Sequence, residues 1–326
     1  MRAIVCKQFG PPEQLVLEDV PAPAKLAPGD VHIRVHAVGV NFPDTLIIQG
    51  KYQFRAEPPF TPGGEVAGEV LAVGEKVKQF KPGDRVVTVQ THGGLAEEMV
   101  CTAMGVLPAP AGMDYVEAAA YPMAYGTSYY ALKQRGRLKA GETLLVLGAA
   151  GGVGLTAVEL GKLMGARVIA AASSDEKLAV CKQQGADEVI NYAREDLKER
   201  VKALTKGQGA DVIYDPVGGD FTQTSLSCIN WDGRLLVIGF ASGPIPSIAA
   251  NRLLLKSCSL VGVFWGASMM REPQANMENF RQLAQWHAEG KLKPHVSKTY
   301  ELKDASQALS DMLARKATGK LVVKVR

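Results

Sequence analysis

The stretch LLVLGAAGGVG, residues 144–154, constrains the fold of this chain more than any other segment. An apolar run typical of a buried strand ends abruptly in glycines and alanines, and the next stretch, 153–165, has the pattern of a helix. A strand that turns through a few small residues into a helix is typical of a βαβ unit, in which a helix connects parallel strands. We therefore expect a parallel sheet that begins here.

Strand-like runs recur after this turn. Helical patterns lie between most of them, as at 175–185. The six runs are 143–148, 167–173, 188–192, 210–217, 234–239 and 259–265. Six short strands that alternate with helices predict a doubly wound α/β sheet, which binds ligands at the carboxyl ends of its strands.

The two ends of the chain have another character. Before residue 126 the sequence has few helix patterns and several β-branched runs between turn residues, at 31–41, 65–74 and 84–90. The tail has helix patterns at 273–289 and 303–315, followed by a last strand, KLVVKV. Since this tail is too small for a domain, we expect one domain from 1–125 and 266–326, with 126–265 inserted as the second.

Composition excludes several classes of protein. The 326 residues are 47% hydrophobic, and the net charge of +4 is scattered, so nucleic acid is not expected as a partner. No run is long and apolar enough to cross a bilayer, and the first residues lack a secretory pattern, so we expect a cytoplasmic protein. The five cysteines are dispersed without a C-x-x-C, which favours buried thiols over disulfides or a thiolate metal site.

The glycine turn predicts a dinucleotide site. Ala149, Gly151 and Gly154 occupy the three small-residue positions of the dinucleotide fingerprint, with Gly148 and Gly152 beside them. Although the first position is Ala, Gly148 can still supply the tight turn. A helix that opens at Gly152 or Val153 would direct free N–H groups at phosphates. The alternative is an ordinary glycine-rich loop, against which the following strand–helix repeats argue.

The tip of the second strand favours NADPH over NADH. An NAD site usually has an acidic residue there for the ribose hydroxyls. This chain has Ser173 and Ser174, with Lys177 nearby, and these groups would attract a 2′-phosphate. Asp175 is the one residue here that argues against NADPH, but as a helix N-cap its carboxylate can turn toward the backbone. A purely helix-capping role for the two serines stays open.

Several longer motifs carry a family likeness that spans the chain. They are GVNFPDTLIIQGKY (39–52), FTPGGEVAGEVLAVGEKVKQFKPGDRV (60–86), AAAYPMAYGTSYYAL (118–132), GAAGGVG (148–154), NYAREDL (191–197), YDPVGG (214–219) and ATGKLVV (317–323). The chain resembles the zinc-independent medium-chain dehydrogenases/reductases of the quinone oxidoreductase, or zeta-crystallin-like, group. The resemblance implies a GroES-like β-barrel catalytic domain, an inserted Rossmann domain, and a homodimer formed through the strand at 259–265.

The resemblance also implies that no metal takes part. Zinc enzymes of this superfamily have Cys and His at the positions matched by Asn41 and Gly64, and a third ligand near Ala119. The four-cysteine zinc lobe is missing as well, because TVQTHGG continues directly into LAEEMV. Without thiolate or imidazole at these positions tetrahedral zinc is not expected. The remaining chemistry is hydride delivery to an acceptor that is already electrophilic, a quinone or a conjugated alkene.

The resemblance assigns roles to individual residues. Asn41 and Tyr52 match positions that face nicotinamide and substrate, where hydrogen-bond donors would stabilise charge on a carbonyl oxygen. A packing role for Tyr52 and a turn-capping role for Asn41 stay open, as do helix packing for Thr127 and Tyr130 and a surface role for Lys316. The expected cofactor contacts are Thr127, Tyr130, Ala149, Gly151, Gly152, Val153, Gly154, Ser173, Ser174, Lys177, Tyr192, Val217, Gly239, Phe240, Phe264, Trp265, Gly266 and Lys316.

Three functions follow, in order of preference. The first is an NADPH-dependent quinone oxidoreductase that transfers hydride without zinc. The second is an NADPH-dependent reductase of conjugated C=C bonds in enones, enals or enoyl-CoA esters, with which Tyr52 is equally compatible. The third is an NADPH-binding protein with a structural or RNA-binding role, against which the lack of basic runs argues.

Overall fold

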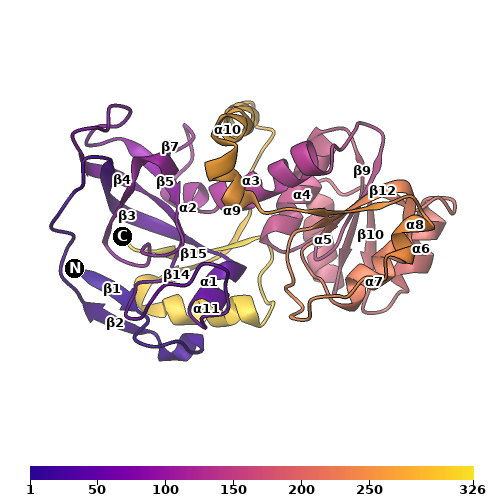
Figure 1. Ribbon diagram of the computed structural model, residues 1–326, viewed down its shortest axis with the longest axis horizontal. Helices are drawn as coiled ribbons and strands as arrows, with labels where there is room; N and C mark the ends of the chain where they lie inside the picture. Colours follow the sequence, from indigo (N-terminus) through magenta and orange to yellow (C-terminus); the bar gives the residue numbers. More distant parts are fainter. The chain divides into compact units, whose positions relative to one another are not determined.

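The computed structural model describes residues 1–326 and divides them into two compact units (Figure 1). The first unit comprises Met1–Met123 and Lys293–Arg326, and the second comprises Ala124–Leu292. The insertion of one unit into the other follows the predicted order, but the second boundary differs from the expected one. Residues 266–292 belong to the second unit, because their long helix makes side-chain contacts there: Trp286 packs edge-on against Tyr129, and Gln134 bonds Asn279.

The first unit is built on strands. A two-stranded sheet pairs β1 with β2, and a larger sheet has the order β14-β15-β3-β4-β5-β7, with β6 also paired to β3. The strands are β1 (Arg2–Val5), β2 (Val16–Asp19), β3 (Asp30–Val40), β4 (Glu65–Val73), β5 (Arg85–Val89), β6 (Glu98–Thr102), β7 (Val106–Pro108), β14 (Val296–Glu301) and β15 (Lys320–Lys324). Its α-helices are α1 (Phe42–Ile47), α2 (Tyr115–Ala119) and α11 (Ala305–Leu313), with 3-10 turns at Pro12–Gln14, Ala103–Gly105 and Leu302–Asp304.

Strand β3 organises this sheet. Its residues alternate along most of the strand between buried and half-exposed, as the period of two in a strand requires, so Val31, Ile33 and Val35 enter the core. It pairs antiparallel with β4, β6 and β15, and β15 in turn pairs parallel with β14. The C-terminal strand therefore lies beside β3, and this brings residues near 320 next to residues near 40.

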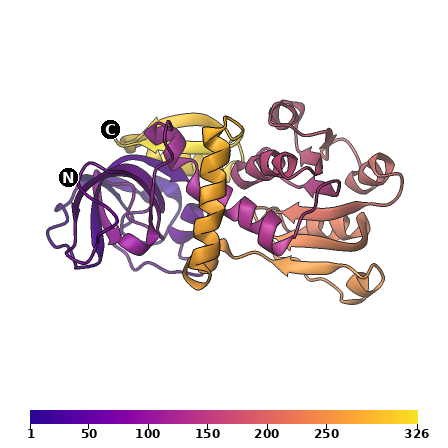
Figure 2. The ribbon, with the colours of Figure 1, turned by 90° about the horizontal axis from the view of Figure 1, so that it is seen from above.

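The second unit is the predicted doubly wound parallel sheet. All neighbouring strands are parallel, in the order β10-β9-β8-β11-β12-β13. The strands are β8 (Thr143–Val146), β9 (Arg167–Ala172), β10 (Glu188–Asn191), β11 (Ala210–Asp215), β12 (Ile229–Val237) and β13 (Ser259–Gly262). The helices are α3 (Pro122–Tyr130), which begins at the unit boundary and continues as a π-helical turn (Ala131–Arg135), α4 (Gly152–Leu163), α5 (Asp175–Gln183), α6 (Leu197–Leu204), α7 (Asp220–Ser227), α8 (Asn251–Leu254), α9 (Trp265–Arg271) and α10 (Pro273–Ala288), the long orange helix seen along its length in Figure 2.

The strand order reverses between β8 and β11. The chain adds β9 and β10 on one side of β8, then returns to add β11, β12 and β13 on the other. A reversal of this kind opens a crevice at the carboxyl ends of the strands, where ligands bind in open α/β sheets. The glycine turn that follows β8 therefore lies at the switch point.

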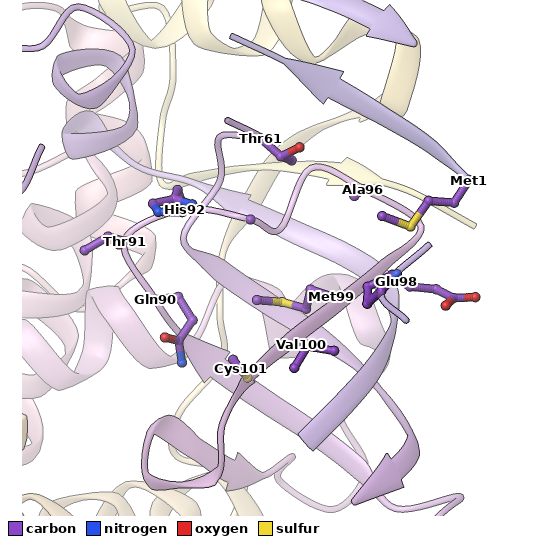
Figure 3. A pocket seen from close by; sticks show the side chains of 12 residues that line it. Met1, Thr61, Gln90, Thr91, His92, Ala96, Glu98, Met99, Val100 and Cys101 are labelled. Carbon is purple, nitrogen blue, oxygen red and sulfur yellow. The ribbon is translucent and has the colours of Figure 1, made fainter. Parts of the chain in front are cut away.

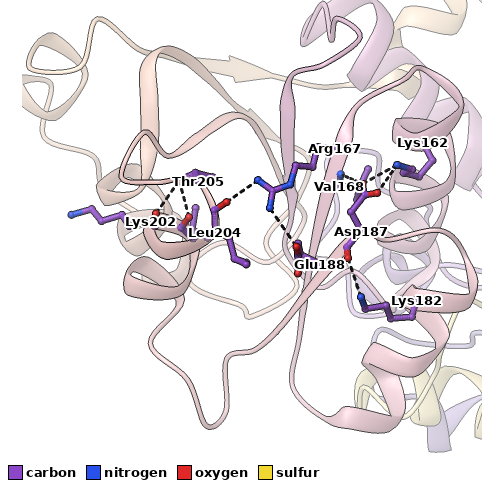
Figure 4. A network of polar contacts seen from close by, with 10 residues as sticks. Lys162, Arg167, Val168, Lys182, Asp187, Glu188, Lys202, Leu204 and Thr205 are labelled. Atoms are coloured by element: carbon purple, nitrogen blue, oxygen red, sulfur yellow. Dashed lines mark hydrogen bonds and ion pairs between the residues drawn. The ribbon is translucent and has the colours of Figure 1, made fainter.

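Polar contacts fix the far end of the same sheet. Asp187 accepts hydrogen bonds from the Lys162 ammonium (2.7 and 2.8 Å) and from the Val168 backbone N–H (2.7 Å), while Arg167 pairs with Glu188 (Figure 4). These contacts join α4 and β9 to the start of β10, away from the switch point. The five cysteines are free and buried, as predicted. No helix of the structure is both long and apolar enough to traverse a bilayer.

Candidate active site

The turn after β8 presents backbone donors at a helix N-terminus. Gly148 has φ +54°, a left-handed conformation that glycine adopts without cost, and its carbonyl accepts the Gly151 N–H at 3.0 Å. Gly151 is the N-cap of α4, and no side chain caps this terminus. The N–H groups of Gly152, Val153 and Gly154 therefore belong to the first turn, which has no intrahelical acceptors and suits an anionic ligand.

Other predicted contacts gather at the carboxyl ends of neighbouring strands. Val217 follows β11, and a Cβ on Gly148 would come within 3.0 Å of its side chain, so these two residues are adjacent. Gly239 and Phe240 follow β12, and Phe240 packs over Gly218 in the β11 loop. Four of the predicted contacts, Ala149, Val217, Gly239 and Phe240, thus follow the carboxyl ends of β8, β11 and β12 at the switch point.

The tip of β9 has the expected polar residues, with one difference. Ser174 is the N-cap of α5 and accepts the Lys177 N–H at 3.4 Å, and the Lys177 ammonium lies 3.4 Å from the Ser173 hydroxyl. The N-cap is therefore Ser174, and the expectation that Asp175 caps the helix is wrong. Asp175 is the first residue of α5, and its side chain bonds to Asn191 at the end of β10. Tyr192, next to it, packs against Phe221.

The residues predicted near the nicotinamide are partly used in packing. Trp265 is buried, donates its indole N–H to Asn276 (3.0 Å), and lies so close to α3 that a Cβ on Gly126 would overlap its ring. Tyr130 is buried, and burial raises the pKa of its phenol. Thr127 is half-buried, whereas Phe264 and Gly266 are exposed. The remaining candidate, Lys316, lies in the first unit, 70% exposed and 3.8 Å from Asp311.

In the first unit Asn41 belongs to a buried charge network. Its amide donates to Glu65 Oε2 (2.8 Å) and to the Gly39 carbonyl (3.1 Å), and its Oδ1 accepts from the Lys320 ammonium (2.6 Å). Lys320 also donates to Glu65 Oε2 (2.7 Å) and to the Val40 carbonyl (3.1 Å). Both amide hydrogens of Asn41 are therefore engaged inside the protein, which favours a positioning role for Asn41 over a donor role.

Glu65 connects this network to α3. The carboxylate is fully buried, and its second oxygen accepts the Met123 backbone N–H at 2.6 Å. Met123 is in the first turn of α3, the helix that carries Thr127 and Tyr130. A carboxylate at this position satisfies a free N–H and complements the positive end of the helix. The Lys320–Glu65 pair therefore also holds the backbone of Met123, the last residue of this stretch of the first unit.

Asp44 lies beside this network and near Tyr52. It is the third residue of α1, and its Oδ2 accepts the Asn41 backbone N–H at 2.7 Å, forming a capping box with Asn41. Burial, with the nearby Glu65, raises the pKa of Asp44 to about 7 against the opposing effect of its backbone hydrogen bonds and Lys320. Tyr52 is half-buried, and burial together with Asp44 raises the pKa of its phenol, so this phenol is protonated at neutral pH.

The raised pKa of Asp44 predicts a pH-dependent stability. Since the folded carboxyl holds its proton to a higher pH than the unfolded one, this group's contribution to stability is present at low pH and declines as pH rises toward 7. Asp44→Asn keeps an acceptor for the Asn41 N–H but cannot ionise. The free energy of unfolding of Asp44→Asn relative to the parent chain should therefore increase by on the order of 2 kcal/mol from about pH 5 to about pH 8. Urea unfolding at both pH values measures this difference.

Asp114→Asn is the matched control for Asp44→Asn, because Asp114 caps α2 from an exposed position. A stability difference for Asp44→Asn that stays the same at both pH values would show that Asp44 does not titrate in this range.

The residues at the matched zinc positions do not fit a metal. Asn41, Gly64 and Ala119 offer neither thiolate nor imidazole, and no group of three or more His, Cys, Asp or Glu side chains in the structure could hold a metal ion. The buried Lys320 ammonium binds the Asn41 amide oxygen and Glu65, so a positive charge is already present there. No step of the chemistry is assigned to a metal.

A separate hollow of about 340 Å³ lies elsewhere in the first unit (Figure 3). The 90–93 loop and β6 supply most of its lining, including His92 and Met99. Its one carboxylate, Glu98, is bonded to His32 at 2.9 Å. None of the predicted site residues lines it, so it is distinct from the Asn41 network and from the glycine turn.

Comparisons with known proteins identify the family. Residues 27–121 match the alcohol dehydrogenase GroES-like domain, and residues 152–286 match the family described as zinc-binding dehydrogenase. A quinone oxidoreductase-like protein 2 homolog from Nematostella vectensis is 43% identical over 100% of this chain and 89% of its own length. The chain belongs to the quinone oxidoreductase group of medium-chain dehydrogenases/reductases.

Solved structures agree with this assignment. The Escherichia coli quinone oxidoreductase complexed with NADPH has a TM-score of 0.92 and 32% identity, with 100% of both chains covered. The CurK enoyl reductase has a TM-score of 0.89 and 28% identity, covering 100% of this chain and 99% of that one. The predicted GroES-like and Rossmann fold of this quinone oxidoreductase-group protein is thereby confirmed, as is its membership of an oxidoreductase family.

Sequence reasoning missed three residues of the buried network in this quinone oxidoreductase-group protein: Asp44, Glu65 and Lys320. Glu65 begins a strand whose next residues are apolar, and Lys320 begins the apolar last strand. An acid and a base at the start of two buried strands were a usable signal, because isolated charges are rarely buried without a partner. That the two strands lie on either side of β3 was not readable from the sequence.

Proposed function

We propose that this chain is an NADPH-dependent quinone oxidoreductase that works without a metal. The uncapped N-terminus of α4 at the switch point is the observation that carries the proposal, because it offers the backbone donors a pyrophosphate needs. Ser173, Ser174 and Lys177 at the tip of β9 suit a 2′-phosphate. The similarity to the NADPH-bound Escherichia coli enzyme supports the same cofactor.

The residues present assign a role to each part of the proposed site. Bound NADPH would supply a hydride. The turn residues Gly151–Gly154 hold the pyrophosphate through backbone N–H groups, and Val217, Gly239 and Phe240 border the same crevice. Tyr52, kept protonated at neutral pH, donates a hydrogen bond to the acceptor oxygen that gains negative charge. The Lys320–Glu65–Asn41 network holds the residue that caps α1 and bonds the backbone of Met123.

A second candidate is reduction of a conjugated C=C bond. The similarity to the CurK enoyl reductase favours it, and Tyr52 is the residue that separates the two reactions. Hydride transfer to a quinone gives a stable hydroquinone monoanion whose oxygen water can protonate, so the phenol proton is not essential. An enolate formed from an enoyl ester needs a proton at carbon, for which a positioned acid contributes about 10²–10⁴-fold.

Tyr52→Phe distinguishes these alternatives. If quinones are the substrates, we expect benzoquinone and phenanthrenequinone reduction to fall by only about tenfold, because a hydrogen bond to the charged oxygen is lost but no proton donor is needed. If activated alkenes are the substrates, turnover of crotonyl-CoA or hexenal should fall by about 10²-fold or more. The decrease in NADPH absorbance measures both reactions, and the same assays are run with NADH as the cofactor. Tyr115→Phe is the control, since Tyr115 lies in the same unit and stacks on His36.

NADPH binding without turnover of any acceptor would remove both enzymatic proposals and leave the structural or RNA-binding role. Faster turnover with NADH than with NADPH would contradict the assignment of Ser173, Ser174 and Lys177.

We further propose a homodimer through residues 259–265. Strand β13 is the edge of the parallel sheet, and edge strands present unpaired backbone groups that another chain can match. Light scattering after size exclusion measures the mass. The Val263 N–H bonds Val237 of β12, so the N–H of Gly262 faces the free edge, and Gly262→Pro, which blocks pairing there, should yield monomers. A monomeric parent chain would contradict the proposal. The cytoplasmic location stays a prediction.

A further inference from the structure

A carboxylate clasp joins the tips of β9 and β10. Asp175 accepts a hydrogen bond from the Asn191 amide at 2.7 Å through one oxygen, and its other oxygen pairs with the Arg194 guanidinium. Asn191 is the buried last residue of β10, and Arg194 is exposed in the turn that follows. The clasp therefore connects the first residue of α5 to the adjacent strand.

The orientation of Asn191 is fixed by its own partners. Its side-chain oxygen accepts the Ala193 N–H at 3.2 Å, so the amide nitrogen must face Asp175. Its backbone N–H donates to Glu195 at 3.0 Å. Arg194 and, after it, Asn191 lower the pKa of Asp175, which is therefore ionised and paired at neutral pH.

The charge balance of this tip depends on Arg194. Two cations, Lys177 and Arg194, accompany three acids, Asp175, Glu176 and Glu195, within the first turn of α5 and the β10 turn, and Glu195 is paired with Arg200. Glu176 interacts with the Ser174 hydroxyl. Removal of Arg194 would leave a negative excess beside Ser173 and Lys177 and release one oxygen of the Asp175 carboxylate, while Asn191 still bonds the other. A free carboxylate at the end of the second strand accepts ribose hydroxyls and repels a 2′-phosphate.

We propose that the Asn191–Asp175–Arg194 clasp sets the preference for NADPH over NADH by holding the Asp175 carboxylate away from the adenosine ribose. The inference rests on the proposed NADPH-dependent function and adds to it three residues that determine selectivity. Arg194 and Asn191 act through Asp175, so they are positioning residues. The clasp also explains how an acidic residue next to Ser173 and Ser174 is compatible with a phosphate ligand.

The test is a double-mutant cycle on cofactor affinity. Dissociation constants for NADPH and NADH, and for 2′-AMP and 5′-AMP as probes of the adenosine end, are measured by calorimetry for the parent chain, Arg194→Gln, Asp175→Asn and the double variant. We expect Arg194→Gln to weaken NADPH and 2′-AMP by about tenfold while NADH and 5′-AMP change less than about twofold. In the Asp175→Asn background, Arg194→Gln should weaken NADPH binding by less than about threefold. High salt should shrink the tenfold effect, because exposed charges are screened.

Each outcome is decisive. Equal losses for NADPH and NADH, or no change, would overturn the inference. An undiminished tenfold loss of NADPH in the Asp175→Asn background would overturn it too, because Arg194 would then contact the phosphate directly. If the parent chain binds neither dinucleotide, the proposed function fails. If the parent chain binds NADPH but the variants have the same NADPH and NADH affinities as the parent, only the clasp is refuted. The melting temperatures of the parent chain and the Arg194→Gln variant should be equal, which shows that a change in affinity does not come from a loss of stability.

Discussion

Lys320→Met is expected to lower the free energy of unfolding by about 3–5 kcal/mol, because it removes one partner of a buried ion pair. Lys320 is 3% exposed and Glu65 is fully buried, and the three donors of the ammonium bond Glu65, Asn41 and Val40. Methionine fills similar space but leaves the Glu65 carboxylate in the interior without its cation. Urea unfolding followed by fluorescence measures the loss.

Two comparisons make this result specific. Lys316→Met removes a 70% exposed lysine four residues away and should change stability by less than about 1 kcal/mol. Glu65→Gln combined with Lys320→Met removes both charges, and we expect it to recover part of the loss, since a neutral pair avoids the uncompensated charge. If Lys320→Met behaves like Lys316→Met, the network does not stabilise the fold.

Gly151→Ala is expected to weaken NADPH binding by about 10²-fold while the protein remains stable. A Cβ at Gly151 meets only the Gly148 carbonyl oxygen, at 3.4 Å, an ordinary contact, so the turn can keep its shape. The methyl group would instead occupy the space through which a pyrophosphate approaches the backbone. A displacement of about 1 Å in such a site can cost about 10²-fold. Calorimetric titration with NADPH, together with the melting temperature, measures both quantities.

Two other glycines serve as controls. Gly154→Ala places a Cβ 2.3 Å from the Gly148 oxygen and 2.9 Å from the Ala149 Cα, so it must distort the turn itself and should lower both stability and affinity. Gly29→Ala meets no atom within 4 Å, in the first unit, and should change neither. Normal NADPH affinity of Gly151→Ala would show that the dinucleotide does not approach this turn.

Much of the second unit followed from local sequence. Apolar runs of five to eight residues, separated by helix patterns, predicted all six parallel strands. The observed strands lie within them or, for β12, extend from 234–239 back to Ile229. A glycine-rich turn after the first of these strands requires no long-range contact, because the conformation of Gly148 and the capping position of Gly151 are set by the turn itself. The candidate residues of this turn were therefore predictable, although their binding role stays a prediction.

Only the tertiary structure decided the environment of Asn41, because its partners come from distant strands. The pairing of β15 with β3 brings Lys320 to Asn41, and the pairing of β4 with β3 brings Glu65 to the same place. In the same way α10 joins the second unit through side-chain packing that the sequence pattern did not reveal, and Asp175 turns to Asn191 instead of capping its helix. Local propensity determined the elements and the glycine turn of this protein, whereas the partners of its buried and charged side chains depended on which strands lie next to each other.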